Sequence, residues 1–253
     1  LPTRTHKTPM LSLGNIYSFD ELFDWDADIQ KRIGIKKPSY VCELKIDGVA
    51  VSLIYRSGFL VAGVTRGDGN QGEEITSNIK TISTLPLIIS DKRDLEVRGE
   101  VYLKRKNFNA LNKRRSVNGE PLFKNPRNSA AGSIRLLDST ETRRRKLDAF
   151  IYNIVEGSPK ETHTGNLDYL RGIDFPVNSH TKQADTIEEA VEYCRYWEEH
   201  KQDLPYDIDG IVLKVNELKY HRQLGSTSSS PRWATAVKFS AEKAKSILLD
   251  VEI

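Results

Sequence analysis

Hydrophobic and polar residues alternate along seven stretches of the chain, and this period of two is typical of β-strands that bury one face. The stretches span residues 40–46, 49–55, 59–65, 95–103, 150–155, 211–215 and 233–239. Arg56-Ser57-Gly58 is suited to a hairpin turn between the second and the third. Because several strands follow one another through short turns, the pattern predicts an α+β fold with mainly antiparallel sheets flanked by helices.

Two stretches combine a helix start signal with helical spacing of apolar residues. Ser18 and Glu21 form a capping box, as do Thr186 and Glu189. The first pair precedes Leu22, Trp25, Ile29 and Ile33, and the second precedes Ala190, Val191, Cys194 and Trp197. We therefore predict one helix after each capping box.

Charged residues interrupt the strand pattern at one position in particular. In a strand over 40–46 and its continuation, Glu43, Lys45 and Asp47 share one face, opposite an apolar face. Three alternating charges with a lysine in the middle are typical of a site, but an exposed strand with salt-bridged side chains has the same pattern. This segment alone leaves both interpretations open.

Other strands repeat the arrangement of an apolar face and a charged face. The segment 96–101 places three charged residues opposite Val97, Gly99 and Val101, and the glycine leaves room for a close approach. In 233–239, Lys238 shares its face with two alanines, which leave space for a ligand. Lys214 ends the apolar run 211–214, and Arg66 precedes a glycine turn at 67–69. Together with the strand over 40–46, these segments predict a ring of cations around one phosphate, formed by Lys45, Arg66, Lys214 and Lys238.

Such a ring has a chemical purpose. A free lysine has a pKa of about 10.4, so only about one in 2,500 is a neutral nucleophile at pH 7. Nearby cations and partial burial lower the pKa of a lysine. The same cations stabilise negative charge that develops on a phosphate under in-line attack. The pattern therefore indicates a lysine that forms a phosphoramidate.

Composition narrows the class of protein. The chain has 253 residues, 38% of them hydrophobic and 29% charged, as expected for one large or two small globular domains. It has no apolar run near the ~20 residues of a membrane span and no secretory leader, so we predict a cytoplasmic protein. Cys42 and Cys194 are far apart and belong to no Cys/His cluster, which favours buried thiols over a disulfide or a zinc site.

The net charge of +3 is unevenly distributed. Between Lys104 and Lys146 there are 13 Lys or Arg residues and 3 acidic residues, so this stretch carries +10 and the remainder −7. So basic a stretch favours a surface for the phosphate backbone of a nucleic acid. On charge alone, a solvated basic surface stays an alternative.

The motifs on these strands resemble those of the covalent nucleotidyltransferases, which comprise DNA and RNA ligases and mRNA capping enzymes. They are K-x-D-G at 45–48, R-G-D-G at 66–69, R-G-E at 98–100, D-G-x-V-x-K at 209–214 and W-A-x-A-x-K-F at 233–239. Within that group the chain is similar to bacterial NAD-dependent DNA ligases through the strings at 10–13, 125–133 and 231–234. The ATP-dependent relatives have an arginine where this chain has Ala50, and Arg66 is the candidate for its role.

The resemblance implies a role for each matching residue. Lys45 would be adenylated, and Asp47 would assist catalysis with Asp209 by orienting lysines or a magnesium-bound water. Arg66, Lys214 and Lys238 would hold the phosphate. Around the nucleoside, the resemblance places Glu43 and the Ser12-Leu13 backbone near adenine, Glu100 on the ribose and Tyr152 stacked on the base.

The resemblance also implies the reaction and its partners. Lys45 would attack the α-phosphate of NAD and release nicotinamide mononucleotide, with Mg²⁺ required, and the adenylate would pass to the 5′-phosphate of nicked double-stranded DNA. Arg127 and Arg135 would grip the nicked strand as part of the basic stretch. We expect a monomer in the bacterial cytoplasm, associated with the nucleoid in DNA replication and repair, and no metal-binding residues in this chain.

The resemblance divides the chain into an adenylation domain over 1–246 and the start of an OB-fold domain over 247–253. Residues 248–253 alternate like a strand, and the sequence begins without Met. Family members also have a helical segment for nicotinamide mononucleotide, a four-cysteine zinc module, helix-hairpin-helix repeats and a BRCT domain. We expect a piece of such a protein, with impaired nick sealing and slow reaction with NAD.

Two alternatives remain. A nucleic-acid-binding module would explain the basic stretch but leaves Lys45 and its neighbouring carboxylates without a role. An ATP- or GTP-using ligase or capping enzyme shares the K-x-D-G motif, although Ala50 and the string at 125–133 argue against it.

Overall fold

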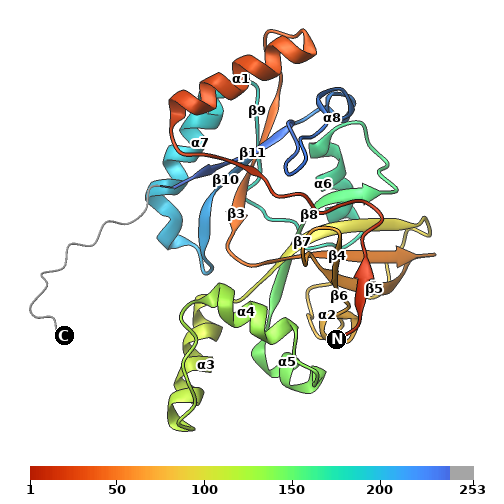
Figure 1. Cartoon of the computed structure of the whole chain (residues 1–253), viewed down its shortest axis with the longest axis vertical. Coiled ribbons are helices and arrows are strands. Elements are labelled where there is room, and N and C mark those ends of the chain that lie inside the picture. The colour runs from red at the N-terminus through yellow and green to blue at the C-terminus, as the bar shows by residue number, and fades with distance from the viewer. Residues whose placement is uncertain (240–253) are drawn as a thin grey trace, which may run out of the picture.

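The computed structural model describes residues 1–239, and two of its β-sheets each pack against their own set of helices (Figure 1). The larger sheet has five strands, which neighbour one another in the order β2-β11-β10-β3-β9. These strands are β2 (Gly14–Ile16), β11 (Ala234–Lys238), β10 (Ile208–Val215), β3 (Tyr40–Ile46) and β9 (Lys182–Ala184). All neighbours pair antiparallel except β2 and β11, which are parallel.

Three helices bury apolar residues against the five-stranded sheet. They are α1 (Phe19–Ile33), α7 (Ile187–His200) and α8 (Leu218–Leu224). The core between α1 and α7 and this sheet includes Leu22, Ile29 and Trp197 from the helices and Cys42 and Leu44 from β3. The apolar face predicted for the Lys45 strand is therefore buried in this core.

The second sheet has four antiparallel strands in the order β5-β4-β7-β8. They are β5 (Phe59–Thr65), β4 (Val49–Arg56), β7 (Leu95–Tyr102) and β8 (Asp148–Glu156). Apolar residues of α2 (Thr76–Ile79), α4 (Pro126–Ile134) and α6 (His163–Gly172) belong to its core. A further pair, β1 (Thr3–Thr5) with β6 (Gln71–Glu73), forms a small antiparallel sheet.

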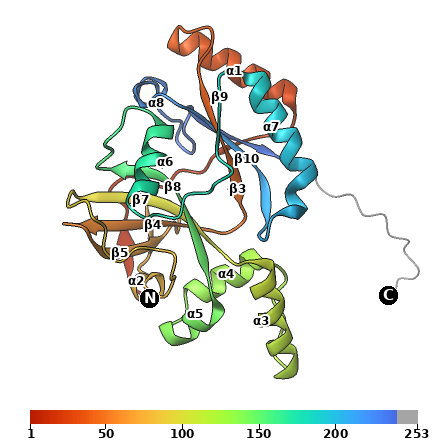
Figure 2. The ribbon, with the colours of Figure 1, turned by 180° about the vertical axis from the view of Figure 1, so that it is seen from behind.

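The basic stretch forms a group of helices at one end of the molecule. It contains α3 (Arg105–Val117), α4 and α5 (Ser139–Arg145), which lie together at the bottom of both Figure 1 and Figure 2. A short 3₁₀ helix, Lys201–Asp203, follows α7. The α3–α5 group thus lies at the opposite end of the molecule from α1 (Figure 1).

The predicted α+β fold with mainly antiparallel sheets is confirmed. The strands predicted at 40–46 and 59–65 have the same bounds as β3 and β5, and the other five differ by at most three residues at an end. Both capping boxes begin helices, since Ser18 accepts a hydrogen bond from Glu21 N and Thr186 accepts one from Glu189 N. The proposed boundary at 246/247 and the strand at 248–253 lie outside the described residues.

Candidate active site

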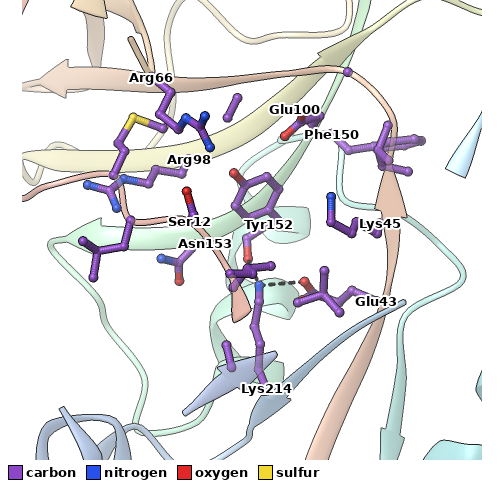
Figure 3. Close-up of a pocket in the computed structure, with 18 of the residues that line it drawn as sticks. Ser12, Glu43, Lys45, Arg66, Arg98, Glu100, Phe150, Tyr152, Asn153 and Lys214 are labelled. Atoms are coloured by element: carbon purple, nitrogen blue, oxygen red, sulfur yellow. Dashed lines mark hydrogen bonds and ion pairs between the residues drawn. The ribbon is translucent and has the colours of Figure 1, made fainter. Parts of the chain in front are cut away.

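A cavity of about 810 Å³ is lined by residues of both larger sheets (Figure 3). Eleven of the thirteen site residues expected from the sequence line it: Ser12, Leu13, Glu43, Lys45, Arg66, Glu100, Arg127, Arg135, Tyr152, Lys214 and Lys238. Asp47 and Asp209 are not in its wall, but each forms an ion pair with a residue that is. The fold therefore brings together residues that are as much as 226 positions apart.

Lys45 lies on β3 and forms an ion pair with a carboxylate from the neighbouring strand β10. Its Nζ is 3.2 Å from Asp209 Oδ1, and Lys238 Nζ is 2.5 Å from Asp209 Oδ2. About a quarter of each lysine side chain is exposed, at 25% and 23%. One carboxylate therefore fixes two cations at the edge of the cavity, and both remain accessible to a ligand.

The turn after Lys45 brings Asp47 to an arginine of α4. Arg127 Nη1 donates to Asp47 Oδ1 at 3.1 Å, and Asp47 N donates to Asp207 O at 3.0 Å. Burial raises the pKa of Asp47, and Arg127 partly offsets this effect. The contact joins the basic α3–α5 group to the K-x-D-G turn.

The K-x-D-G turn requires glycine at position 48 because of its close contact with β7. A Cβ at Gly48 would lie 2.3 Å from Val101 O of β7, a distance that the backbone cannot accommodate without moving. The backbone at Gly48 thus packs directly against β7 of the four-stranded sheet. Gly99 of β7 is similarly restricted, since its Cβ would lie 2.5 Å from Phe150 O, as the predicted close approach requires.

Glu43 and Lys214 form a buried ion pair at another part of the cavity wall (Figure 3). Lys214 Nζ is 2.6 Å from Glu43 Oε2 and donates to Tyr152 O at 3.1 Å. Glu43 Oε1 is 2.6 Å from His163 Nε2. Burial alone raises the pKa of Glu43, but the Lys214 ammonium and His163 outweigh it and hold that pKa at about 2.

Tyr152 and Glu100 lie on adjacent strands of the four-stranded sheet. Figure 3 shows the Tyr152 ring near the centre of the cavity, with Glu100 above it and Lys214 below it in this view. Burial raises the pKa of Glu100 to about 8, and Lys45 and Arg127 limit the increase. Around neutral pH the Glu100 carboxyl is therefore largely protonated in the free protein.

Arg66 directly follows β5 and lies next to Ala50, the position at which the resemblance implies an arginine in ATP-dependent ligases. Its backbone N donates to Ala50 O at 3.0 Å, so the end of β5 is adjacent to position 50 of β4. Its exposed side chain lies in the wall of the cavity, and Figure 3 shows its guanidinium on the same side as Tyr152 and Arg98. This position is compatible with the expectation that Arg66 takes the role of the arginine expected at position 50 in ATP-dependent ligases.

The N-terminal segment 8–13 crosses from one sheet to the other and forms a wall of the cavity. Arg98 of β7 donates to Thr8 O at 2.6 Å and to Pro9 O at 3.1 Å. Farther along, Met10 N donates to Gly69 O and Ser12 N donates to Ser229 O. Four hydrogen bonds thus hold the segment in place, and one of them uses the Ser12 backbone that the resemblance places near adenine.

Part of the charge between Lys104 and Lys146 has a structural role. Arg105 is 2.6 Å from Asp207 Oδ1 and donates to four backbone carbonyls of residues 201–206. Arg135 Nε is 2.6 Å from Glu73 Oε2 but remains exposed. The exposed basic residues of this stretch are Lys106, Lys113, Arg114, Lys124, Arg127, Arg135, Arg143, Arg144 and Lys146.

Two residues near the cavity had no role in the sequence analysis. His163 contacts Glu43 although 120 residues separate them, and a single histidine has no local pattern that reveals such a contact. Arg98 was assigned only to a charged strand face, and no spacing in the sequence indicates that it binds backbone carbonyls of the N-terminal segment. The two cysteines are buried free thiols, as predicted.

Within residues 1–239 there is no cluster of three or more His, Cys, Asp or Glu side chains arranged to hold a metal ion. In the same part of the chain, no helix combines the length and the apolar character that crossing a membrane requires.

Residues 1–242 match the family described as NAD-dependent DNA ligase adenylation domain. The chain is 48% identical over 250 residues to a DNA ligase of Halalkalibacterium halodurans, an alignment that covers 98% of this chain and 37% of that protein. It is 49% identical over 252 residues to a DNA ligase of Oceanobacillus iheyensis, covering 98% and 38%. A solved structure, mycobacterial DNA ligase D complexed with ATP and MES, aligns with a TM-score of 0.47 and 10% identity over 79% of this chain and 54% of that chain. The chain therefore spans a little over a third of the length of these curated relatives.

Proposed function

The chain belongs to the NAD-dependent DNA ligase adenylation domain family, and we propose that its Lys45 accepts adenylate from NAD as a covalent adduct. One observation carries this proposal. Lys45 Nζ lies at the edge of the cavity, 3.2 Å from Asp209 Oδ1, and the same cavity contains both the carboxylates and the cations that a dinucleotide requires.

The proposed step replaces one bond at the α-phosphorus of NAD by another. The Lys45 ammonium first loses a proton, and Asp209 is the carboxylate placed to accept it. The amine lone pair then forms a P–N bond, while the bond between the α-phosphorus and the bridging oxygen breaks. Nicotinamide mononucleotide leaves with that oxygen, and the second amine proton is lost to solvent. Because the reaction transfers a nucleotidyl group, positioning and electrostatic stabilisation account for most of the catalysis.

Residues on one side of Lys45 suit the adenosine half of NAD. Tyr152 offers an aromatic face on which the base can stack. Such stacking contributes binding energy beyond that of burying the apolar surface. Glu43 and the 12–13 backbone lie near the base in this proposal, and Glu100 binds the ribose hydroxyls. All of these groups line the same cavity.

The cationic side chains of the cavity are suited to binding the phosphates of NAD. Arg66 and Lys238 line the cavity, and we assign them to the phosphate that Lys45 attacks. Lys214 was grouped with them in the sequence analysis, but its ion pair with Glu43 supports a place at the base instead. We therefore assign Lys214 to the base end of the nucleotide.

We also propose that the reaction uses Mg²⁺, and the carboxylates present are suited to it. Mg²⁺ is typically bound through one or two carboxylates together with waters and substrate phosphates. The charge of Asp209 raises the pKa of Asp47, so the two carboxylates lie close together, and they would orient a water bound to the ion. The ion would neutralise charge on the phosphates, while Asp209 positions the two lysines.

We also propose that the whole protein seals nicks in double-stranded DNA during replication and repair, in the bacterial cytoplasm and at the nucleoid. The adenylate would pass from Lys45 to the 5′-phosphate of the nick, and the 3′-hydroxyl would then displace AMP. The exposed cations of α3–α5 support a DNA-binding face there, with Arg127 and Arg135 on the nicked strand. We propose a monomer, with any structural zinc held by a module outside this chain.

A donor test decides between this function and its alternatives. The chain is incubated with Mg²⁺ and either NAD, ATP or GTP, and its intact mass is followed over hours. We expect a mass increase of one adenylate with NAD only, and none in Lys45→Arg, because a guanidinium stays protonated at neutral pH. An adduct from ATP or GTP would indicate a different donor class, and no adduct from any donor would favour a DNA-binding module without catalysis.

A further inference from the structure

A histidine that the proposed reaction leaves without a role lies behind the base end of the cavity. His163 is the first residue of α6, and none of its surface is exposed to solvent. Its Nε2 is 2.6 Å from Glu43 Oε1 and 3.2 Å from Lys214 Nζ. Its Nδ1 is buried and has no hydrogen-bond partner among the described residues.

These contacts determine the protonation state of the His163 ring. If the proton were on Nδ1, a buried N–H would have no acceptor. The bare Nε2 would then accept from Lys214 Nζ at 3.2 Å, but it would face the Glu43 carboxylate oxygen at only 2.6 Å. If both nitrogens were protonated, the orphan Nδ1–H would remain and a cation would lie beside Lys214. A proton on Nε2 alone leaves only an unpaired lone pair. Burial and the Lys214 charge also lower the pKa of His163, although Glu43 acts in the opposite direction.

The neutral ring therefore donates to Glu43, and the two oxygens of the carboxylate are held by different donors. His163 holds Oε1 and Lys214 holds Oε2, so the Glu43 side chain has a fixed orientation. Lys214 in turn uses two of its donors on Glu43 and Tyr152 O. One Lys214 donor and the remaining carboxylate lone pairs are thus available to a ligand.

We propose that His163 is a positioning residue that keeps the Glu43 carboxylate in an acceptor-only orientation, so that the cavity selects 6-aminopurines over 6-oxopurines. This inference rests on the proposed function, because it requires the base to lie against Glu43. It adds to the proposed adenylate transfer a mechanism for selecting the base, in which His163 acts only through Glu43.

The chemistry of the two bases explains the selection. Adenine presents an amino group next to ring nitrogens, so it offers a donor to Glu43 and an acceptor to Lys214. Hypoxanthine presents a carbonyl oxygen in place of the amino group, and that oxygen would face a carboxylate. A site built to hydrogen-bond a particular group rejects an analogue that leaves its buried polar atoms unpaired.

Removing the His163 donor would relax this selection. Glu43 Oε1 would lose its partner, and the carboxyl would be able to rotate or to take up a proton in a buried site. A protonated carboxyl can donate a hydrogen bond to a 6-oxo group and can still accept one from a 6-amino group. The site would then bind both bases. His163→Leu removes the donor, whereas His163→Gln places an amide N–H near the position of Nε2.

The test compares AMP with IMP by isothermal titration calorimetry. We expect the wild-type chain to bind AMP at least tenfold more tightly than IMP, and His163→Gln to keep a preference of that order. In His163→Leu the two dissociation constants should agree within about threefold. The matched control is His221→Phe, because His221 is also buried but stacks on Trp233 and contacts Val215 O. This control should keep the wild-type ratio.

The outcomes separate the inference from the function on which it rests. Equal binding of AMP and IMP by the wild type, or an unchanged ratio in His163→Leu, would overturn the inference and leave adenylate transfer intact. A wild-type chain that binds neither nucleotide would overturn the proposed function and the inference together. If His163→Leu fails to fold, the ¹⁵N shifts of the wild-type ring at pH 7 provide the test. A protonated Nε2 with a bare Nδ1 supports the inference, and a protonated Nδ1 overturns it.

Discussion

Most of the charged side chains in and beside the cavity form ion pairs with one another. Asp209 contacts both Lys45 and Lys238, Asp47 contacts Arg127, and Glu43 contacts Lys214. Glu100 has no ion-pair partner among residues 1–239, and burial raises the pKa of its carboxyl to about 8. The residues of this site therefore differ in how their charge responds to pH.

Glu100 should make adenosine binding dependent on pH. Its pKa is about 8 in the free protein, whereas ribose hydroxyls donate best to an ionised carboxylate. Binding must then release a proton below pH 8, so affinity weakens as pH falls. We expect the dissociation constant for adenosine to increase from pH 8 to pH 6, by up to about tenfold per unit. Calorimetry in buffers of different ionisation enthalpy measures both the affinity and the released proton.

Glu100→Gln is the informative variant for this prediction. It should weaken adenosine binding by about tenfold or more at pH 8, since charge-assisted hydrogen bonds contribute about 1.5 to 3 kcal/mol. It should also remove the pH dependence between 6 and 8. Asp47→Asn is the control and should retain that dependence. A wild-type affinity that is constant over this range would show that Glu100 does not bind ribose as a carboxylate.

At the scale of elements, the K-x-D-G turn depends on the contact between β3, β4 and β7. Gly48→Ala would place a methyl group 2.3 Å from Val101 O, so the strands must move apart. We expect the free energy of unfolding to decrease by about 1 to 3 kcal/mol, the usual effect of overpacking. Urea unfolding followed by tryptophan fluorescence measures it.

Gly172→Ala is the matched control for the turn. Gly172 ends α6, its φ is not positive, and a Cβ there would meet nothing within 4 Å. Alanine should be neutral at this position or stabilise the protein by up to about 1 kcal/mol. Equal effects of the two substitutions would contradict the importance of the close approach at Gly48.

The strands were predictable from the sequence because burial on one face produces a visible period of two. Most of the helices were not. The segment of α3 buries only Leu111, so it shows no helical spacing of apolar residues. For α4, the sequence contains a start signal, with Asn125 at the N-cap and Pro126 at the first position, but the residues after it have only weak helical spacing of apolar side chains. Here local capping chemistry contained information that hydrophobic spacing did not.

The candidate site was predictable to the extent that its residues belong to short motifs. Those motifs identified the carboxylates and cations, and the structure brings most of them to one cavity. The pairing between them was not predictable. It depends on strand order, since β10 lies between β11 and β3 and thus places Lys214 diagonally opposite Glu43. His163 comes from a helix that no sequence pattern connects to β3.

At the scale of the whole molecule, the cavity lies where the two sheets meet, and the basic helices α3–α5 extend from the same region. Arg127 belongs to both, because it lines the cavity and contacts Asp47. A DNA strand held by α3–α5 would therefore lie near Lys45. This arrangement links the proposed DNA surface to the proposed adenylation site.

Binding of nicked duplex DNA should depend on salt through this surface. The logarithm of the association constant should fall with the logarithm of salt concentration, with a slope of about −0.9 per phosphate neutralised. Arg127→Ala with Arg135→Ala should make the slope less steep by about two such units. Lys36→Ala with Lys37→Ala removes the same charge from two exposed residues that follow α1, and it should leave the slope unchanged, because α1 lies at the opposite end of the molecule from α3–α5 (Figure 1). Equal slopes in both double variants would place the DNA surface elsewhere.

The central claim is that Lys45 carries the adenylate, and mapping the adduct tests it most directly. The wild-type chain is incubated with NAD and Mg²⁺ for increasing times, digested, and analysed by tandem mass spectrometry that preserves the acid-labile phosphoramidate. We predict a time-dependent adenylate on the peptide that contains Lys45, and none on this peptide in Lys45→Arg. An adduct on Lys214 or Lys238, or an adduct that persists in Lys45→Arg, would contradict the account.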